Sequence, residues 1–223
     1  MFDTLSALLP ASALPMPLET FLLFVPACFA LNMAFGPNNL LALTNGARGG
    51  VGTAVAASFG RLAAFTIMIF ITAVGLGAVL MASETVFSVV KFAGAAYLVW
   101  LGIKICRAKA PVATFSAGEA PRPIRSLQRQ EFWVAAGNPK AVLIFTAFFP
   151  QFVNPNAYAA SFVLISAVFM VLEIVGIAAY AAIGARFSNM LADARPLKWF
   201  NRVSGGMMIG FGVLLALARR PAA

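Results

Sequence analysis

Two charged residues, Glu173 and Arg61, lie inside long apolar stretches of this sequence. The apolar segments on either side of Glu173 are each shorter than the ~20 residues that a helix needs to cross a bilayer. A carboxyl group at that depth must face the protein interior, pair with a cation, line water or hold a proton. Glu173 is therefore a candidate for taking up and releasing a proton. The alternative is a fixed ion pair with Arg61 or Lys140 that only locks helices together.

Arg61 has two interpretations. The stretch from Leu62 to Met81 can cross a bilayer by itself, so Arg61 can lie at the membrane boundary and extend its guanidinium group to the lipid headgroups. In the other interpretation it lies deeper and pairs with Glu173. We name Glu173 and Arg61 as the candidate coupling or charge pair.

Proline beside polar side chains interrupts the apolar stretches at three places. Proline removes a helical hydrogen bond, and neighbouring amides can partner the freed backbone or a ligand. Amides suit both the ammonium and the carboxylate of a zwitterion, so the breaks predict a solute pathway, with simple helix bending as the alternative. The candidate pathway residues are Gly36, Pro37, Asn38, Asn39, Asn138, Pro139, Lys140, Pro150 and Gln151. We expect an inner cluster of Asn38, Asn39, Asn138 and Lys140, and an outer one at Gln151.

The elements that must hold these residues are membrane helices. Hydrophobic residues make up 61% of the chain, charged residues only 10%, and the mean hydropathy is +0.91, which excludes an ordinary soluble domain. The pattern predicts an all-α integral membrane protein in which residues 1–223 form one domain. The six expected spans lie near 18–43, 51–81, 86–106, 132–153, 158–185 and 199–218.

The net charge of +9 follows the membrane and does not indicate a nucleic-acid surface. Most cations fall after the first, third and fifth spans, so the positive-inside rule places loops 43–50, 107–130 and 186–198 in the cytoplasm. Both chain ends then face outward, unless Gly36-Pro37 turns the first span back as a re-entrant segment. The basic faces are expected to contact membrane lipids.

The two halves of the chain correspond at a nearly constant spacing. Lys91-Phe92-Ala93-Gly94 matches Arg202-Val203-Ser204-Gly205, Arg61 corresponds to Glu173, and Pro37 to Pro150. Three spans in each half reverse the polarity of the second half, which predicts a 3+3 inverted repeat with proline-broken first and fourth helices. Repeat one covers about 18–106, a basic linker 107–130, and repeat two about 131–220. Glycines on these helices would permit close packing within the bundle or in a homodimer.

The residue inventory argues against an enzyme. The chain has no histidine, and neither Cys28 and Cys106 nor the scattered carboxylates have metal-ligand spacing, so no metal site or cofactor is expected. Other possibilities are an exporter of a different small solute, such as a cation or a hydrophobic amine, an intramembrane enzyme, or a structural membrane subunit.

Three motifs, in order along the chain, resemble the LysE superfamily of amino-acid exporters, most closely its RhtB (homoserine and threonine efflux) branch. They are Gly36-Pro37-Asn38-Asn39, the segment Gly94 to Gly102, and Asn138-Pro139-Lys140-Ala141 through Phe148-Phe149-Pro150-Gln151-Phe152. The resemblance implies an inner-membrane exporter that moves amino acids or close derivatives outward by proton antiport. It also implies that the proline motifs belong to the transport pathway.

One position departs from this resemblance. After Gly60, similar proteins often carry an acidic or apolar residue, whereas this chain has Arg61. An ion pair between Arg61 and Glu173 would oppose a proton-carrying role for Glu173.

Overall fold

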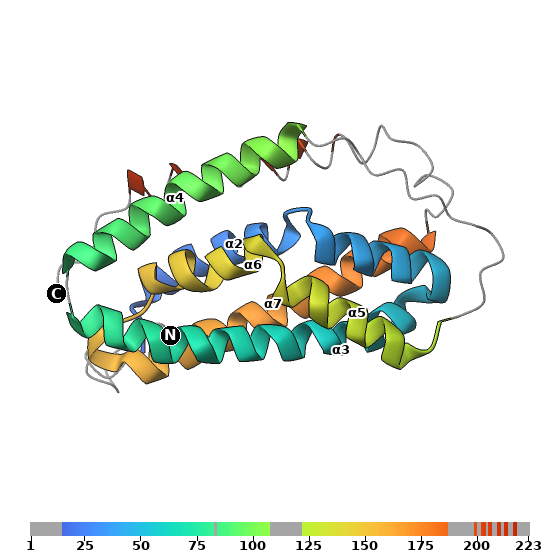
Figure 1. Ribbon diagram of the computed structural model, residues 1–223, viewed down its shortest axis with the longest axis horizontal. Coiled ribbons are helices and arrows are strands. Elements are labelled where there is room, and N and C mark those ends of the chain that lie inside the picture. Colours follow the sequence, from blue (N-terminus) through green and yellow to red (C-terminus); the bar gives the residue numbers. More distant parts are fainter. Residues whose placement is uncertain are drawn as a thin grey trace, which may run out of the picture.

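A computed structural model describes residues 15–82, 84–107 and 122–186, together with single positions between 199 and 217. Within these ranges the chain is almost entirely helical and contains no strand. The helices lie roughly along one long axis, as Figure 1 shows. Part of the sixth predicted span, and most of the loops at 107–130 and 186–198, lie outside the described residues.

The first predicted span is interrupted where its proline motif begins. Helix α2 (Leu18–Met33) ends before Ala34, whose backbone is extended, and helix α3 (Pro37–Ala82) starts at the proline. Pro37 has no N–H to donate, so its position at the start of a helix costs no hydrogen bond. The first span is therefore a broken helix, as the proline motif predicted.

Helix α3 reverses direction at Gly50. The backbone there has φ of 78° and ψ of 174°, a left-handed conformation that glycine adopts without strain. In Figure 1 the blue first part of α3 runs to the right-hand end, and its teal second part returns along the molecule. Residues 43–49, which we predicted as a loop, are helical, because one glycine is enough to make the turn.

The remaining described helices follow α3 along the chain. They are α4 (Glu84–Arg107), α5 (Ile124–Ala136), α6 (Pro139–Leu143) and α7 (Tyr158–Arg186), with short π and 3-10 turns η2 (Ile144–Phe148), η3 (Phe149–Gln151) and η4 (Pro155–Ala157) between α6 and α7. The segments 124–136 and 139–151 are bent by 52° at the Asn138-Pro139 break. Two helical stretches, 37–75 and 158–186, are long and apolar enough to cross a membrane, and this bent pair would make a third.

Helix α5 corrects the predicted linker and the predicted fourth span. Residues 124–130, assigned to the linker, belong to the helix, so the fourth helix starts earlier than residue 132. Leu127, Glu131 and Ala135 follow one another at four-residue spacing and form its buried face. Leu127 and Ala135 are apolar, so this segment, although rich in polar residues, has a face that packs as a helix against α3.

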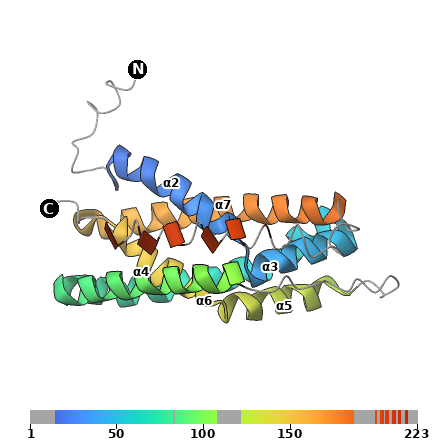
Figure 2. The same cartoon turned by 90° about the horizontal axis from the view of Figure 1, so that it is seen from above.

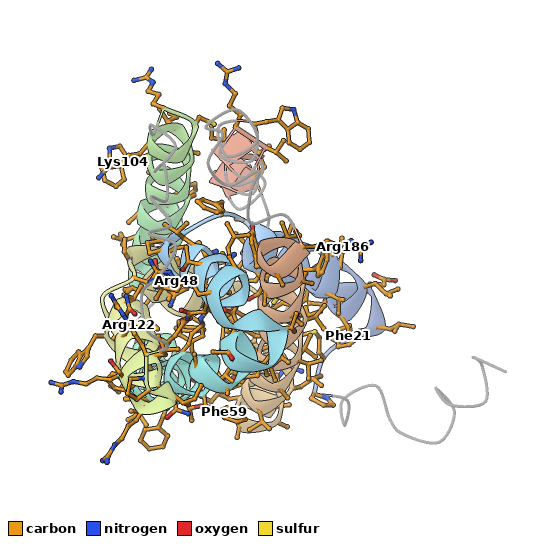
Figure 3. All side chains as sticks on the ribbon, turned by 90° about the vertical axis from the view of Figure 1, so that its right-hand side faces the viewer. Phe21, Arg48, Phe59, Lys104, Arg122 and Arg186 are labelled. Carbon is orange, nitrogen blue, oxygen red and sulfur yellow. The ribbon has the colours of Figure 1, made fainter. Side chains whose placement is uncertain are left out.

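The end of the molecule at the Gly50 turn carries many cations. Arg48 precedes the turn, Arg107 ends α4, Arg122 precedes α5, and Arg186 ends α7. Figure 3 views the molecule from this end and labels Arg48, Lys104, Arg122 and Arg186. The helices thus gather at one end the charges that the positive-inside rule uses to assign the cytoplasmic side.

Helix α3 packs most extensively against α7 and α5. Helix α4 lies apart from these three along most of its length in Figure 1, and Figure 2 shows it on the opposite side of the molecule from α2. Its Gly102 and Ala95 approach Gly205 and Gly212 of the last part of the chain. These contacts fit the predicted close packing of glycines, whereas Gly75, Gly206 and Gly210 face open space.

Glycine permits the backbones of α3 and α5 to meet beside Arg61. A Cβ atom at Gly60 would overlap the backbone carbonyl of Gln128. We expect Gly60→Ala to lower the free energy of unfolding by about 1–3 kcal/mol, because the helices would have to separate. The check is the melting temperature of the purified protein in detergent. Gly52→Ala is the matched control, because Gly52 has nothing within 4 Å of a Cβ position, and equal melting temperatures would contradict the prediction.

Candidate functional site

The two proline-marked helix breaks lie against each other. Lys140 Nζ donates to the carbonyl oxygens of Leu31 at 3.0 Å and Ala34 at 2.7 Å, where α2 ends. Asn138 Nδ2 donates to Asn38 Oδ1 at 2.6 Å. A break in the first part of the chain is therefore bonded directly to a break more than a hundred residues later.

Local sequence rules form the second break. Asn138 is the N-cap of α6, and its Oδ1 accepts the backbone N–H of Lys140 at 3.0 Å. Pro139 occupies the first turn, where its missing N–H leaves no bond unmade. Because Asn138 Oδ1 is committed to the cap, its Nδ2 is the atom that faces Asn38, which fixes the orientation of both amides.

The carbonyl groups freed at the first break receive side-chain donors. Asn39 Nδ2 donates to Asn32 O at 2.8 Å and Ala34 O at 3.0 Å. Tyr180 on α7 donates its hydroxyl to Met33 O at 2.6 Å. Buried carbonyls without such partners would destabilise the fold, so the polar side chains keep the break open without leaving it unsatisfied.

Beside the breaks, Arg61 lies between two carboxylates. Its guanidinium group is fully buried and donates from Nε and Nη2 to Glu131 Oε2, at 3.0 and 2.9 Å. Its Nη1 donates to Glu173 Oε1 at 2.9 Å and, more weakly, to Asn39 Oδ1 at 3.5 Å. Its Nη2 also donates to the backbone carbonyl of Asn38. Arg61 therefore joins α3, α5 and α7, and its guanidinium group lies in the protein interior.

The two carboxylates differ in their surroundings. The Glu131 side chain is 0% exposed, and its Oε1 accepts from Asn45 Nδ2 at 3.3 Å. The Glu173 side chain is 7% exposed, and within the described residues only its Oε1 has a hydrogen-bond partner. Glu131 is thus enclosed on all sides, while Glu173 keeps one oxygen accessible.

Two amide atoms near this cluster lack hydrogen bonds. In the described part of the chain, Asn32 Oδ1 and Asn38 Nδ2 are buried and have no partner. The Asn32 orientation is fixed because its Nδ2 donates to the carbonyl oxygen of Cys28 at 3.0 Å. An unpaired buried acceptor and an unpaired buried donor are costly, so each is a natural contact for a polar ligand.

The structure brings together most, but not all, of the predicted site residues. Pro37, Asn38, Asn39, Asn138, Pro139 and Lys140 meet at the breaks with Arg61 and Glu173, and Gly36 lies beside the Lys140 side chain. Pro150 is buried in η3, where Phe149 packs against Phe24 and Phe145. Gln151 Nε2 bonds weakly to Ala147 O in its own turn, at 3.4 Å.

Three site residues were missed from the sequence: Glu131, Asn32 and Asn45. Glu131 shows a usable signal, because Leu127 and Ala135 place it on the same apolar helix face. The predicted linker at 107–130 includes Leu127, so the sequence prediction does not contain this helix face. Among the described residues, no group of three acidic, cysteine or histidine side chains could hold a metal ion.

Lys140 is expected to stabilise the contact between the breaks. Lys140→Met keeps an unbranched side chain, one atom shorter, but removes the donor to Leu31 O and Ala34 O. We expect a loss of about 1–3 kcal/mol in the free energy of unfolding, because two carbonyls lose a charged donor. Thermal unfolding in detergent measures it. Lys104→Met, on an exposed side chain of α4, is the control, and a Lys140→Met variant as stable as this control would refute the role.

The fold and this cluster define a helical membrane protein with a polar site at interrupted helices. The chain belongs to the LysE type translocator family, whose model matches residues 29–219. It is therefore a translocator and not an enzyme. No solved structure matches the chain significantly.

Curated relatives extend over nearly the whole chain. The chain is 29% identical to the "Homoserine/homoserine lactone efflux protein" of Salmonella typhimurium, over 92% of this chain and 99% of the relative. It is 25% identical to the "Leucine efflux protein" of an Enterobacter species, over 88% and 94%. It is 27% identical to an "Uncharacterized membrane protein" of Vibrio cholerae, over 92% and 100%. These relatives agree with a multi-pass protein of the bacterial inner membrane.

Proposed function

We propose that this protein exports amino acids or close derivatives from the cytoplasm by proton antiport. The observation that carries the proposal is the buried Arg61–Glu173 pair at the meeting point of the two helix breaks, where Glu173 keeps an accessible oxygen. Family membership supports transport. The names of the homoserine and leucine efflux relatives support amino-acid substrates.

The polar groups at the breaks suit a zwitterion. The accessible oxygen of Glu173 and Asn32 Oδ1 can accept hydrogen bonds from an ammonium group. Asn38 Nδ2 and the ammonium of Lys140 can donate to a carboxylate, and the N-terminus of α3 at Pro37 adds a favourable dipole. A substrate bound between these groups would give hydrogen-bond partners to Asn32 Oδ1 and Asn38 Nδ2, which otherwise have none.

The helix arrangement supports the 3+3 inverted repeat. Each half contains a first crossing broken before a proline, Pro37 in α3 and Pro139 in α6. The second crossings contribute Arg61 and Glu173, which correspond in the repeat and contact each other. We therefore retain six spans in one domain, with repeats at about 18–106 and 131–220, and take Pro139 in place of Pro150 as the structural counterpart of Pro37.

The cation-rich end at the Gly50 turn is proposed to face the cytoplasm. The aromatic cluster of Phe24, Phe148 and Phe152 belongs to α2 and to the segment 144–152. Both segments run from the breaks toward the end opposite the Gly50 turn in Figure 1, so the cluster would lie on the outer side. Pro150 and Gln151, in the same stretch, remain candidates for the outer section of the pathway. In proton coupling, the Glu173 carboxylate would release Arg61 and bind either a proton or the substrate ammonium in its place.

The proposal is tested with purified protein in liposomes. Vesicles with an acidic interior should accumulate labelled leucine or homoserine, because protons leave as the substrate enters. An uncoupler that collapses the pH gradient and vesicles without protein are the controls. Flux of neither compound would refute export of these amino acids and favour another solute. Substrate flux that is the same with and without the pH gradient would refute proton antiport.

A further inference from the structure

Arg61 is shared unequally between its two carboxylates. Two of its nitrogens contact Glu131, at 2.9 and 3.0 Å, whereas only Nη1 contacts Glu173, at 2.9 Å. One cation thus faces two carboxylates. When Arg61 is counted with Glu131, the pair is neutral, and the charge of Glu173 is left to be balanced by something else.

Glu131 is held in place more firmly than Glu173. Both of its oxygens are bonded, one to Arg61 and one to Asn45, and its side chain has no exposed surface. Nearby on α5, Gln128 meets Gly60 backbone to backbone, and Gln128 Nε2 donates to Ala56 O at 3.0 Å. These contacts fix α5 against α3 and keep the Glu131 carboxylate beside Arg61.

We propose that Glu131 is a positioning residue, the permanent counter-ion of Arg61, and that it thereby leaves Glu173 free to exchange Arg61 for a proton or a substrate ammonium. This inference rests on the proposed function, because it takes Glu173 as the coupling group. It goes beyond that function by assigning a second carboxylate with a different role.

The reason is electrostatic. Without Glu131, Arg61 would have Glu173 as its nearest counter-ion, and releasing Glu173 would leave a guanidinium charge buried without compensation. With Glu131 present, Glu173 can be neutralised while Arg61 stays paired. The other ionisable groups around Glu173 are Lys140 on α6, Cys28 on α2 and Tyr180 on α7. Lys140 and Tyr180 donate to backbone carbonyls of the first break.

Infrared spectroscopy of the full-length protein in lipid membranes tests this without a substrate. A protonated carboxylic acid has a C=O stretching band distinct from that of a carboxylate. We expect a band that appears as the pH falls and is absent in Glu173→Gln. In Glu131→Gln the band should appear at a more acidic pH, by about one to three units, because Arg61 then stabilises the ionised form of Glu173 alone.

A double variant provides a second route if Glu131→Gln does not fold. Arg61→Gln/Glu131→Gln removes both charges of the neutral pair, so its band should appear within about one pH unit of the wild-type position. A band that is unmoved in Glu131→Gln would overturn the proposal. A band that is lost in Glu131→Gln and retained in Glu173→Gln would also overturn it. The same holds if the band of the double variant is displaced along the pH axis by more than the band of Glu131→Gln, or if the wild-type protein shows no titrating band.

The test also separates the two proposals. If the wild-type protein carries neither leucine nor homoserine while the bands move as expected, the assigned substrate is wrong and the role of Glu131 stands. If transport follows the pH gradient and the bands do not move, the role of Glu131 is wrong and the transport function stands.

Discussion

Replacing Arg61 with glutamine should lower the free energy of unfolding by about 3–5 kcal/mol, the range found when one partner of a buried ion pair is removed. Arg61 and Glu131 are both fully buried, so the variant leaves the Glu131 carboxylate without its cation. It also removes the donor to Asn38 O at the start of α3. The measurement is the melting temperature in detergent together with the yield of monodisperse protein.

Two further variants show whether the cost comes from the unpaired charge. Arg61→Gln/Glu131→Gln should regain much of the lost stability, because neither buried charge remains to be compensated. Arg125→Gln removes an exposed arginine from α5 and should melt like the wild-type protein. The explanation fails if Arg61→Gln is as stable as Arg125→Gln, or if the double variant is less stable than Arg61→Gln.

The features that could be predicted from the sequence are determined by residues close together in the chain. Glu173 had to be deep because both flanking apolar segments are too short to cross a bilayer, and the structure buries it on α7. The breaks before Pro37 and at Asn138-Pro139 follow from the missing N–H of proline and from an asparagine cap. Such rules act within a turn or two of helix, so they can be read from the chain alone.

The features that the sequence did not reveal depend on contacts between distant segments. Whether Arg61 reached the headgroups or the interior was decided by α5, which brings Glu131 to it where Gly60 meets Gln128. Because we had placed residues 124–130 in a linker, no partner for Arg61 was expected from that region. The correspondence of Pro37 with Pro150 rests on spacing alone. An inner cluster of Asn38, Asn39, Asn138 and Lys140 was expected, but the particular hydrogen bonds that join the Pro37 break to the Pro139 break depend on how the helices pack.

The second large effect is expected for Glu173→Gln, which should abolish accumulation driven by the pH gradient while leaving the protein folded. Glutamine has nearly the same shape, and its side-chain oxygen can still accept from Arg61 Nη1. Arg61 keeps Glu131 as its counter-ion, so no buried charge is left alone. Stability should therefore fall much less than in Arg61→Gln.

The size of the transport effect follows from the driving force. With one proton exchanged per substrate, a gradient of one pH unit is worth about 1.4 kcal/mol and supports about tenfold accumulation of leucine or homoserine in acid-interior vesicles. An amide cannot carry the proton, so Glu173→Gln should bring the internal concentration only to that outside. Exchange of labelled for unlabelled substrate at equal pH should persist, because it needs no net proton movement. Wild-type accumulation by Glu173→Gln would show that protons cross by another route and would return Glu173 to the role of a fixed partner of Arg61.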